Sequence, residues 1–264
     1  MPRLRASSMS LGAHKADWEE LATLDPMWAI LSAKDKRGNR WGEAEFFETG
    51  RAEIERLMRE VGGLCSGRGK ALDFGCGLGR LTRSLLAYYR EAHGVDVSET
   101  MISRARRFTP QCQFHVNDSE DLSLFPDETF DLVYSNIVLQ HLPCAGMIAK
   151  YLREFFRVAT PGGLVVFQVP DRKSLRNVLN LKRSAYHLLK VLGVGSGVVF
   201  TRFKLHPMRM TAMPRSEVLA VVGEAGGEVI KQRPDTSARF GVFYGCRRLD
   251  VSHKQRVRIA AAGV

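Results

Sequence analysis

The chain has 264 residues, of which 45% are hydrophobic and 25% are charged, and its formal net charge is +11. This composition predicts a soluble globular protein and excludes a disordered, collagen-like or disulfide-framework protein. No apolar run approaches the roughly 18–20 residues of a membrane-spanning helix. The first residues lack the apolar stretch of a secretory signal, so we expect a cytoplasmic protein.

The positive charge is concentrated in one part of the sequence. Residues 1–170 carry 21 Lys/Arg and 22 Asp/Glu, whereas residues 171–264 carry 18 and 6. Residues 172–215 contain ten basic side chains and no acidic one. The excess is therefore a property of this segment and not of the whole chain.

The first 64 residues are predicted to form an N-terminal helical cap. From Asp17 to about Leu64, apolar side chains recur at three- and four-residue spacings, which is typical of helices. Trp41 and Phe46 lie in this region. They are either part of a lid over a binding site or a simple pair of packed helix side chains.

Short apolar runs alternate with helical patterns over residues 65–170, which we treat as the core domain. The runs predict strands at 71–74, 93–97, 112–116, 130–135 and 164–169. The intervening patterns predict helices at 80–89, at 99–107 with Ser98 as the N-cap, and at 148–158. This alternation is typical of a doubly wound, mostly parallel α/β sheet.

The predicted order after residue 170 is a basic helical insert over 171–215, more of the core sheet over 216–249, and a tail over 250–264. The insert contains an amphipathic pattern over 174–192. Such a helix could cover a site as a substrate lid, rest on an anionic membrane surface or bind a partner. A helix at 217–225 and closing strands at 228–231 and 240–246 are expected to complete the sheet.

A glycine-rich turn follows the first core strand and carries the strongest functional signal. The segment runs from Asp73 through Gly75, Gly77 and Gly79 to Arg80. Glycines in such a turn let the backbone approach a ligand and adopt positive φ, although a G-x-G pattern alone could be only a tight turn. Arg80 stands where a dinucleotide fingerprint would need its third glycine. The preceding Asp73 disfavours a phosphate and favours a cationic ligand.

Acidic or polar residues also follow the next strands. Asp96 ends the second strand, 21 residues after Gly75, where a carboxylate can hold a ribose diol. Asp118 follows the third strand and could accept a hydrogen bond from an adenine amino group. A capping role for Asp96 and a turn role for Asp118 remain the alternatives. Asn136 follows the fourth strand.

These motifs resemble those of class I S-adenosylmethionine-dependent methyltransferases of the broad small-molecule type. The matching segments are LDFGCGLGR (72–80), GVDVSETM (94–101), NDSEDL (117–122), FDLVYSNIVLQHL (130–142) and RVATPGGLVVFQVP (157–170). The resemblance implies a Rossmann-like, seven-stranded sheet that ends in an antiparallel strand. It also implies S-adenosylmethionine as the cofactor, but it does not name the methyl acceptor.

The resemblance also implies roles for individual residues. Asp73 and the backbone of Gly75 and Gly77 are expected near the methionine moiety, and Asn136 beside its end. Asp96, with Val97 next to it, is expected to hold the ribose hydroxyls. Asp118 and Ser119 are expected to frame the adenine.

The acceptor is only partly constrained by sequence. The residues 135–138 read Ser-Asn-Ile-Val, which is neither the [DN]-P-P-[YFW] box of amino-directed nucleic-acid methyltransferases nor the Pro-Cys of cytosine-C5 enzymes. His141 is the best candidate for a general base, since it lies just past the fourth strand, although it could merely pack near the pocket. His187 and His206 in the insert are further candidates.

Three functions are therefore considered. The first is a methyltransferase that acts on a small or lipid-like metabolite, with possible peripheral membrane contact through 174–192. The second is an RNA methyltransferase, which the scarcity of stacking aromatics in the basic insert disfavours. The third is a non-catalytic binding module that keeps the fold. The sequence contains no dedicated metal-ligand cluster, and the oligomeric state is left open.

Overall fold

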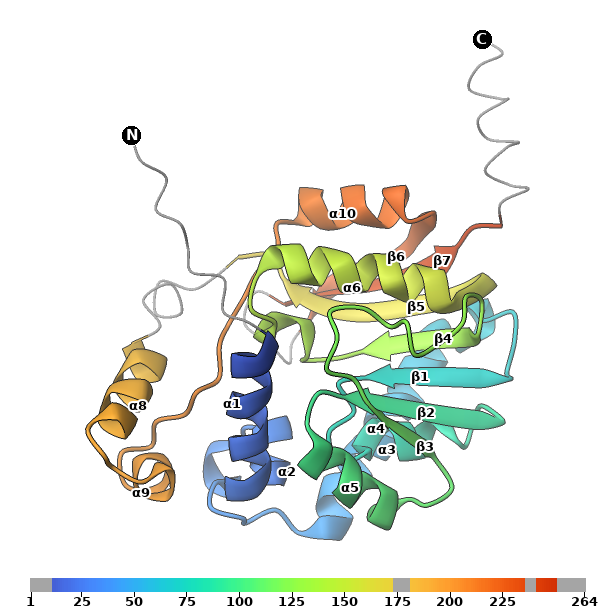
Figure 1. The fold of residues 1–264 in the computed structure, drawn as a ribbon. Coiled ribbons are helices and arrows are strands. Elements are labelled where there is room, and N and C mark those ends of the chain that lie inside the picture. Colours follow the sequence, from blue (N-terminus) through green and yellow to red (C-terminus); the bar gives the residue numbers. More distant parts are fainter. Residues whose placement is uncertain (1–10, 173–180, 236–240, 251–264) are drawn as a thin grey trace, which may run out of the picture.

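The computed structural model describes residues 11–172, 181–235 and 241–250, which form a seven-stranded sheet with helices on both faces (Figure 1). The prediction of an α/β fold with a mostly parallel, seven-stranded sheet is confirmed. The strands are β1 (Lys70–Phe74), β2 (Glu91–Asp96), β3 (Gln113–Val116), β4 (Phe130–Ser135), β5 (Ala159–Pro170), β6 (Gly227–Asp235) and β7 (Gly241–Arg248).

The strand order places a topological switch at the centre of the sheet. The order is β3-β2-β1-β4-β5-β7-β6, and β1 pairs in parallel with both β2 and β4. Strand β7 runs antiparallel to β5 and to β6. In open α/β sheets, ligands bind beyond the carboxyl ends of the strands where the order reverses. The fold therefore predicts a ligand site beyond Phe74 and Ser135.

Helices cover both faces of the sheet, and a separate group lies at the carboxyl ends of the strands (Figure 1). No helix in the described ranges is long and apolar enough to cross a membrane. The helices are α1 (Leu11–Leu24), α2 (Pro26–Ile30), α3 (Glu43–Val61), α4 (Arg80–Leu85), α5 (Glu99–Phe108), α6 (Ala145–Val158), α8 (Leu181–Val191), α9 (Ser196–Thr201) and α10 (Arg215–Glu224).

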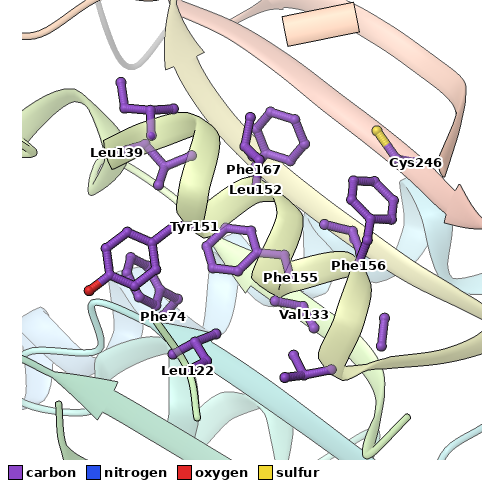
Figure 2. Packing of buried hydrophobic residues seen from close by; sticks show 14 of the residues in the cluster. Phe74, Leu122, Val133, Leu139, Tyr151, Leu152, Phe155, Phe156, Phe167 and Cys246 are labelled. Atoms are coloured by element: carbon purple, nitrogen blue, oxygen red, sulfur yellow. The ribbon is translucent and has the colours of Figure 1, made fainter. Parts of the chain in front are cut away.

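The largest core cluster lies between the sheet and helices α6 and α10. Figure 2 shows Leu152 and Phe155 of α6 beside Val133 of β4 and Phe167 of β5. These four side chains are fully buried, and burial of each such side chain contributes about 1.5–3 kcal/mol. On the opposite face, α3, α4 and α5 form a second cluster against the same strands.

A third cluster joins the N-terminal helices to the segment that follows residue 180. It contains Leu21 of α1, Trp28 of α2 and Phe46 of α3, together with Phe200 of α9 and Met101 of α5. The Trp28 and Phe200 rings meet edge to face with centroids 5.3 Å apart. The N-terminal helices and the basic insert therefore share one apolar core beside the switch point.

Several element boundaries differ from the sequence predictions. Helix α4 ends at Leu85 and not at Tyr89, because the backbone N–H groups of Arg90 and Glu91 already donate to the carbonyls of Arg68 and Gly69. Strand β5 begins at Ala159, before the predicted start, and its pairing with β4 shifts register between Phe130 and Leu132.

Differences also occur in the two regions outside the core sheet. Helix α1 begins at Leu11, six residues before the helical pattern was expected to start. Helix α8 forms the second part of the amphipathic segment predicted over 174–192, and residues 174–180 lie outside the described residues. The early start of α1 matters, because its first turn reaches the candidate site.

Candidate active site

A cavity lies at the carboxyl ends of β1, β2, β3 and β4, where the strand order reverses; we call it the switch-point cavity. Helix α1 and the end of α2 contribute to its wall. Four strand ends contribute polar or backbone groups to the lining, α1 and α4 contribute further polar side chains, and the rest of the lining is largely apolar. The lining includes Leu11, His14, Trp18, Ala29, Ile30, Gly75, Gly77, Arg80, Asp96, Val97, Asn117, Asn136, Ile137, Val138 and His141.

The glycine-rich turn after β1 forms the floor of this cavity. Gly75 and Gly77 have φ values of 75° and 53°, a region that residues with a Cβ rarely adopt. A Cβ on Gly75 would lie 2.4 Å from the Val138 side chain, and one on Gly77 would lie 2.5 Å from Ile30. Glycine is therefore required both by conformation and by space, and the bare backbone faces the cavity.

Asp96 fixes this turn and lines the same cavity. Its Oδ2 accepts a hydrogen bond of 2.8 Å from the Gly77 N–H, and its Oδ1 accepts one of 2.9 Å from the Ser98 N–H. Burial raises the pKa of the Asp96 carboxyl above its ordinary value. A carboxylate can accept about four hydrogen bonds in all, so Asp96 can still accept a hydroxyl from a ligand.

The residue that follows β3 and lines the cavity is Asn117. The sequence prediction had instead named the next two residues, Asp118 and Ser119. Asn117 is 6% exposed and lines the cavity. The Asp118 side chain is 71% exposed and lies 3.4 Å from Lys15 Nζ. The Ser119 hydroxyl donates to Asn117 Oδ1 at 2.9 Å. Asp118 and Ser119 lie outside the cavity lining, and Ser119 contacts it through Asn117.

Asp73 lies beneath the glycine turn and not in the cavity wall. It is 1% exposed, and its Oδ2 accepts a 2.6 Å hydrogen bond from the Thr82 hydroxyl in α4. Burial raises its pKa to about 7, although the Thr82 hydrogen bond and Arg80 act in the opposite direction. Asp73 therefore supports the glycine turn and does not line the cavity. The turn separates its carboxyl group from any ligand in the cavity.

A buried carboxylate that sequence reasoning missed lies next to the cavity. Glu53 of α3 accepts hydrogen bonds from Arg80 Nη2 at 2.9 Å, Tyr134 Oη at 2.9 Å and Asn136 Nδ2 at 2.6 Å. The side chains of Arg80 and Glu53 are only 4% and 12% exposed. Glu53 therefore fixes the side chain of Asn136, whose sequence position had already suggested a role. No motif marks Glu53 in the sequence.

Helix α1 closes the cavity from the side opposite the sheet. Leu11, His14 and Trp18 line the cavity, and burial lowers the pKa of His14 to about 4, with smaller contributions from His141 and two arginines. Asp17 on the same helix pairs with Arg183 of α8 at 2.6 Å. The helix that lines this side of the cavity is therefore tied to the basic insert.

His141 lines the switch-point cavity just past the end of β4. Its Nδ1 lies 2.7 Å from the Arg209 carbonyl oxygen, which can only accept, so Nδ1 carries the proton and Nε2 the lone pair. Nε2 lies 3.3 Å from Gln140 Nε2. Burial lowers the pKa of His141, which favours the neutral imidazole. His141 thus has the protonation state of a base.

The other aromatic candidates take different places. His206 lines a second cavity described below, whereas His187 lies 3.8 Å from Asp17 and lines neither cavity. Trp41 and Phe46 pack edge to face with centroids 6.0 Å apart. Trp41 lines the second cavity, and Phe46 is fully buried.

A strained residue marks the far wall of the switch-point cavity. Ile137, directly after Asn136, has φ of 62°. Left-handed backbone costs a residue with a Cβ about 1–2 kcal/mol, and a β-branched residue is a clear outlier there. Such strain is typical of functional sites.

A second and larger space, the basic cleft, adjoins the switch-point cavity. It lies between residues 28–56 of the N-terminal region and residues 181–210 of the insert, and its volume is about 1580 Å³. Its wall contains eight Lys/Arg side chains and one acidic side chain, Glu53. The two cavities share five lining residues: Ala29, Ile30, Arg80, Ile137 and His141.

Comparison with known proteins agrees with this geometry. Residues 72–167 match the profile of a family described as a methyltransferase domain. This part of the chain is a class I S-adenosylmethionine-dependent methyltransferase domain. The matched range contains β2 to β4, most of β1 and of β5, and every strand-end residue of the switch-point cavity.

Similar curated proteins carry different methyltransferase names. The chain is 35% identical over 140 residues to malonyl-[acyl-carrier protein] O-methyltransferase of Halorhodospira halophila, a match of 50% of this chain and 45% of that protein. It is 35% identical over 123 residues to trans-aconitate 2-methyltransferase of Methylobacterium nodulans, a match of 46% of this chain and 43% of that protein. It is 31% identical over 178 residues to 2-methyl-6-phytyl-1,4-hydroquinone methyltransferase of Synechocystis sp., a match of 65% of this chain and 54% of that protein. The matched region spans about half the length of these relatives.

Solved structures extend the similarity of the fold beyond the matched domain. Magnesium protoporphyrin IX methyltransferase of Synechocystis PCC 6803, solved with bound S-adenosylmethionine, aligns with a TM-score of 0.58 at 15% identity. The alignment covers 92% of this chain and 99% of that protein. A methyltransferase of Leishmania major aligns with a TM-score of 0.60 at 17% identity, and the alignment covers 89% of this chain and 82% of that protein. At these identities the likeness concerns the fold alone.

Proposed function

We propose that this protein transfers a methyl group from S-adenosylmethionine to a small or lipid-like metabolite. The observation that carries the proposal is the wall shared by the switch-point cavity and the basic cleft. A cofactor in the first and an acceptor in the second would meet at Ile137 and His141. The relatives named above act, by their names, on an acyl-carrier thioester, a tricarboxylic acid and a phytylated quinol, so both acidic and lipid-like acceptors have precedents.

The residues of the switch-point cavity fit the cofactor. The bare backbone at Gly75 and Gly77 lines the cavity, and a ligand can approach a glycine backbone closely. Asp96 offers carboxylate oxygens for a ribose diol, and Asn117 at the neighbouring strand end lines the same cavity and would face the adenine. The largely apolar lining suits the remaining surface of a nucleoside. When bound, S-adenosylmethionine supplies a methyl group on a positively charged sulfur.

The protein's own contribution is then mainly alignment and water exclusion. Helix α1 covers the cavity, and the turn held by Asp96 fixes one side of it. We propose that His141 Nε2 removes the acceptor proton, because its Nδ1 is fixed by the Arg209 carbonyl and its pKa is lowered by burial. A neutral imidazole is the form that can accept a proton.

For His141→Gln we expect kcat to fall by about 10²–10⁴-fold, the usual contribution of a general base. The KM for S-adenosylmethionine should change little. The acidic limb of the kcat–pH profile should also disappear, since a glutamine does not titrate. Both parameters are measured by formation of S-adenosylhomocysteine with a saturating acceptor. An unaltered pH profile, or a change confined to KM, would assign His141 a packing role instead.

The experiment that tests the proposed function has two steps. Calorimetric titration with S-adenosylhomocysteine should show binding at one site per chain. Incubation with methyl-labelled S-adenosylmethionine and a metabolite extract should then transfer label to an extractable small molecule. Binding without transfer to any fraction would favour a non-catalytic module, and the absence of binding would contradict the proposal altogether.

A specific observation also favours contact with a membrane surface. The exposed side of α8 carries Leu181, Leu188 and Val191, which are 63%, 60% and 84% exposed, and Leu192 directly after it is 69% exposed. Residues 172–215 contain no acidic side chain. We therefore propose that this apolar stripe rests on an anionic lipid surface, to which the surrounding cations are attracted.

The double variant Leu188→Glu/Val191→Glu should lose sedimentation with phosphatidylglycerol vesicles, because it places two negative charges on the stripe. Both positions are largely exposed, so the fold should persist, and circular dichroism checks this. Leu219→Glu on α10, 38% exposed, is the matched control and should sediment like the wild type. Equal sedimentation of all three proteins, or equal binding to phosphatidylcholine vesicles, would contradict the contact.

A further inference from the structure

The basic cleft has a chemical character that narrows the acceptor, an inference that depends on the proposed function. We propose that the acceptor carries an anionic group, such as a carboxylate or phosphate, on an apolar body. The anionic group would lie among the cations of the cleft, and the atom to be methylated would lie at the wall shared with the switch-point cavity. The proposal follows from the balance of charge, the unpaired donors and the apolar surface of the cleft.

Three of the eight basic side chains in the cleft already have partners. Arg80 pairs with Glu53, which is the one acidic side chain of the lining. Arg183 pairs with Asp17. The Arg37 guanidinium donates to the carbonyl oxygens of residues 200, 204 and 205 at 2.7–3.0 Å. These three arginines join α3, α1 and the insert to their neighbours and define the shape of the cleft.

The other five basic side chains have no acidic partner among the described residues, where none of them forms an ion pair within 4.0 Å. They come from both sides of the cleft, so their fields add in the space between. They are Lys34, Arg40, Arg56, Lys182 and Lys204.

Two buried donors strengthen the case for an anion. In the described residues, the Nε atoms of Arg37 and Arg80 are buried and have no hydrogen-bond acceptor. Both arginines line the cleft, and the Arg80 side chain is only 4% exposed. A buried donor without an acceptor is destabilising. A ligand oxygen would supply such an acceptor if the atoms that cover either Nε moved aside.

The remaining lining is apolar enough to hold the body of the acceptor. Trp28, Trp41 and Met208 are among the residues that supply it. His206 between these surfaces has a pKa lowered to about 4, first by burial and then by Lys182 and Arg37. It stays neutral at pH 7 and adds no charge of its own. The cleft thus combines an apolar wall with unpaired cations.

The test uses the whole protein saturated with S-adenosylhomocysteine and two probes that share one chain length. Decyl phosphate and decyl glucoside, both below their micelle concentrations, are titrated calorimetrically. The double variant Arg56→Gln/Lys182→Gln removes one free cation from each side of the cleft. The control Arg59→Gln/Arg107→Gln also removes two exposed positive charges, and neither of them lines the cleft. Arg59 lies on α3, as Arg56 does.

We expect the wild type to bind decyl phosphate at least about tenfold more tightly than decyl glucoside, since a charge-assisted hydrogen bond contributes about 1.5–3 kcal/mol. The cleft variant should lose most of this preference, and the control variant should keep it. Equal affinity for the two probes, or an unchanged preference in the cleft variant, would overturn the inference. The proposed function would not be contradicted by that result, as long as the protein still binds S-adenosylhomocysteine. Tight binding of a single-stranded RNA that decyl phosphate cannot displace would also overturn it, in favour of a nucleic-acid acceptor.

Discussion

Replacement of Asp96 by asparagine is expected to weaken S-adenosylhomocysteine binding by about 100-fold. A hydrogen bond to a charged acceptor contributes about 1.5–3 kcal/mol, and each 1.4 kcal/mol is a factor of ten in affinity. The amide also cannot accept from both the Gly77 and the Ser98 N–H groups while its NH₂ faces one of them. The variant thus loses a ligand contact and part of the support of the glycine turn. Calorimetric titration measures the loss.

Asp118→Asn is the matched control for this prediction. It makes the same chemical change at the end of the adjacent strand, on a carboxylate that is 71% exposed and faces Lys15. Its effect on S-adenosylhomocysteine affinity should stay below about threefold, since exposed ion pairs contribute less than 1 kcal/mol. If Asp118→Asn weakens binding as much as Asp96→Asn does, the adenine contact expected from sequence is correct and the placement of Asn117 is not decisive.

Glu53→Leu is expected to reduce the free energy of unfolding by about 3–5 kcal/mol, the usual cost of removing one partner of a buried ion pair. Arg80 would remain buried without its carboxylate, and Tyr134 and Asn136 would lose their hydrogen-bond acceptor. Urea unfolding followed by circular dichroism measures the change.

Two further variants make the Glu53 result interpretable. Glu55→Leu lies on the same helix, pairs with the exposed Arg51 and should cost less than about 1 kcal/mol. Glu53→Gln keeps an oxygen acceptor and should fall between the two. A loss below about 1 kcal/mol for Glu53→Leu would mean that the buried network does not hold Asn136 and Arg80 in place.

Much of the core sheet could be predicted because its signals are local. Alternation of apolar runs with helical patterns gave β1 to β5, and Ser98 does cap α5, since its hydroxyl accepts from the Met101 N–H. Boundaries were less accurate where partners far along the chain decide them. Helix α4 stops early because Arg90 and Glu91 bond to residues 68 and 69.

The candidate site was predictable only where a motif marks it. Neighbouring residues at a strand end point in different directions, so the sequence could not decide between Asn117 and Asp118. Glu53 and His14 lie on helices without a signature, and only tertiary packing brings them to the cavity. The basic segment was evident from composition, but its five unpaired cations could be separated from the paired ones only in three dimensions.

A crystal structure of the protein with S-adenosylhomocysteine tests most directly whether the switch-point cavity is the cofactor site. The ribose hydroxyls should lie within hydrogen-bond distance of Asp96, the adenine beside Asn117, and the sulfur should face the wall formed by Ile137 and His141. A ligand bound elsewhere, or bound here with its sulfur turned away from the basic cleft, would contradict both the cofactor site and the proposed path of the methyl group.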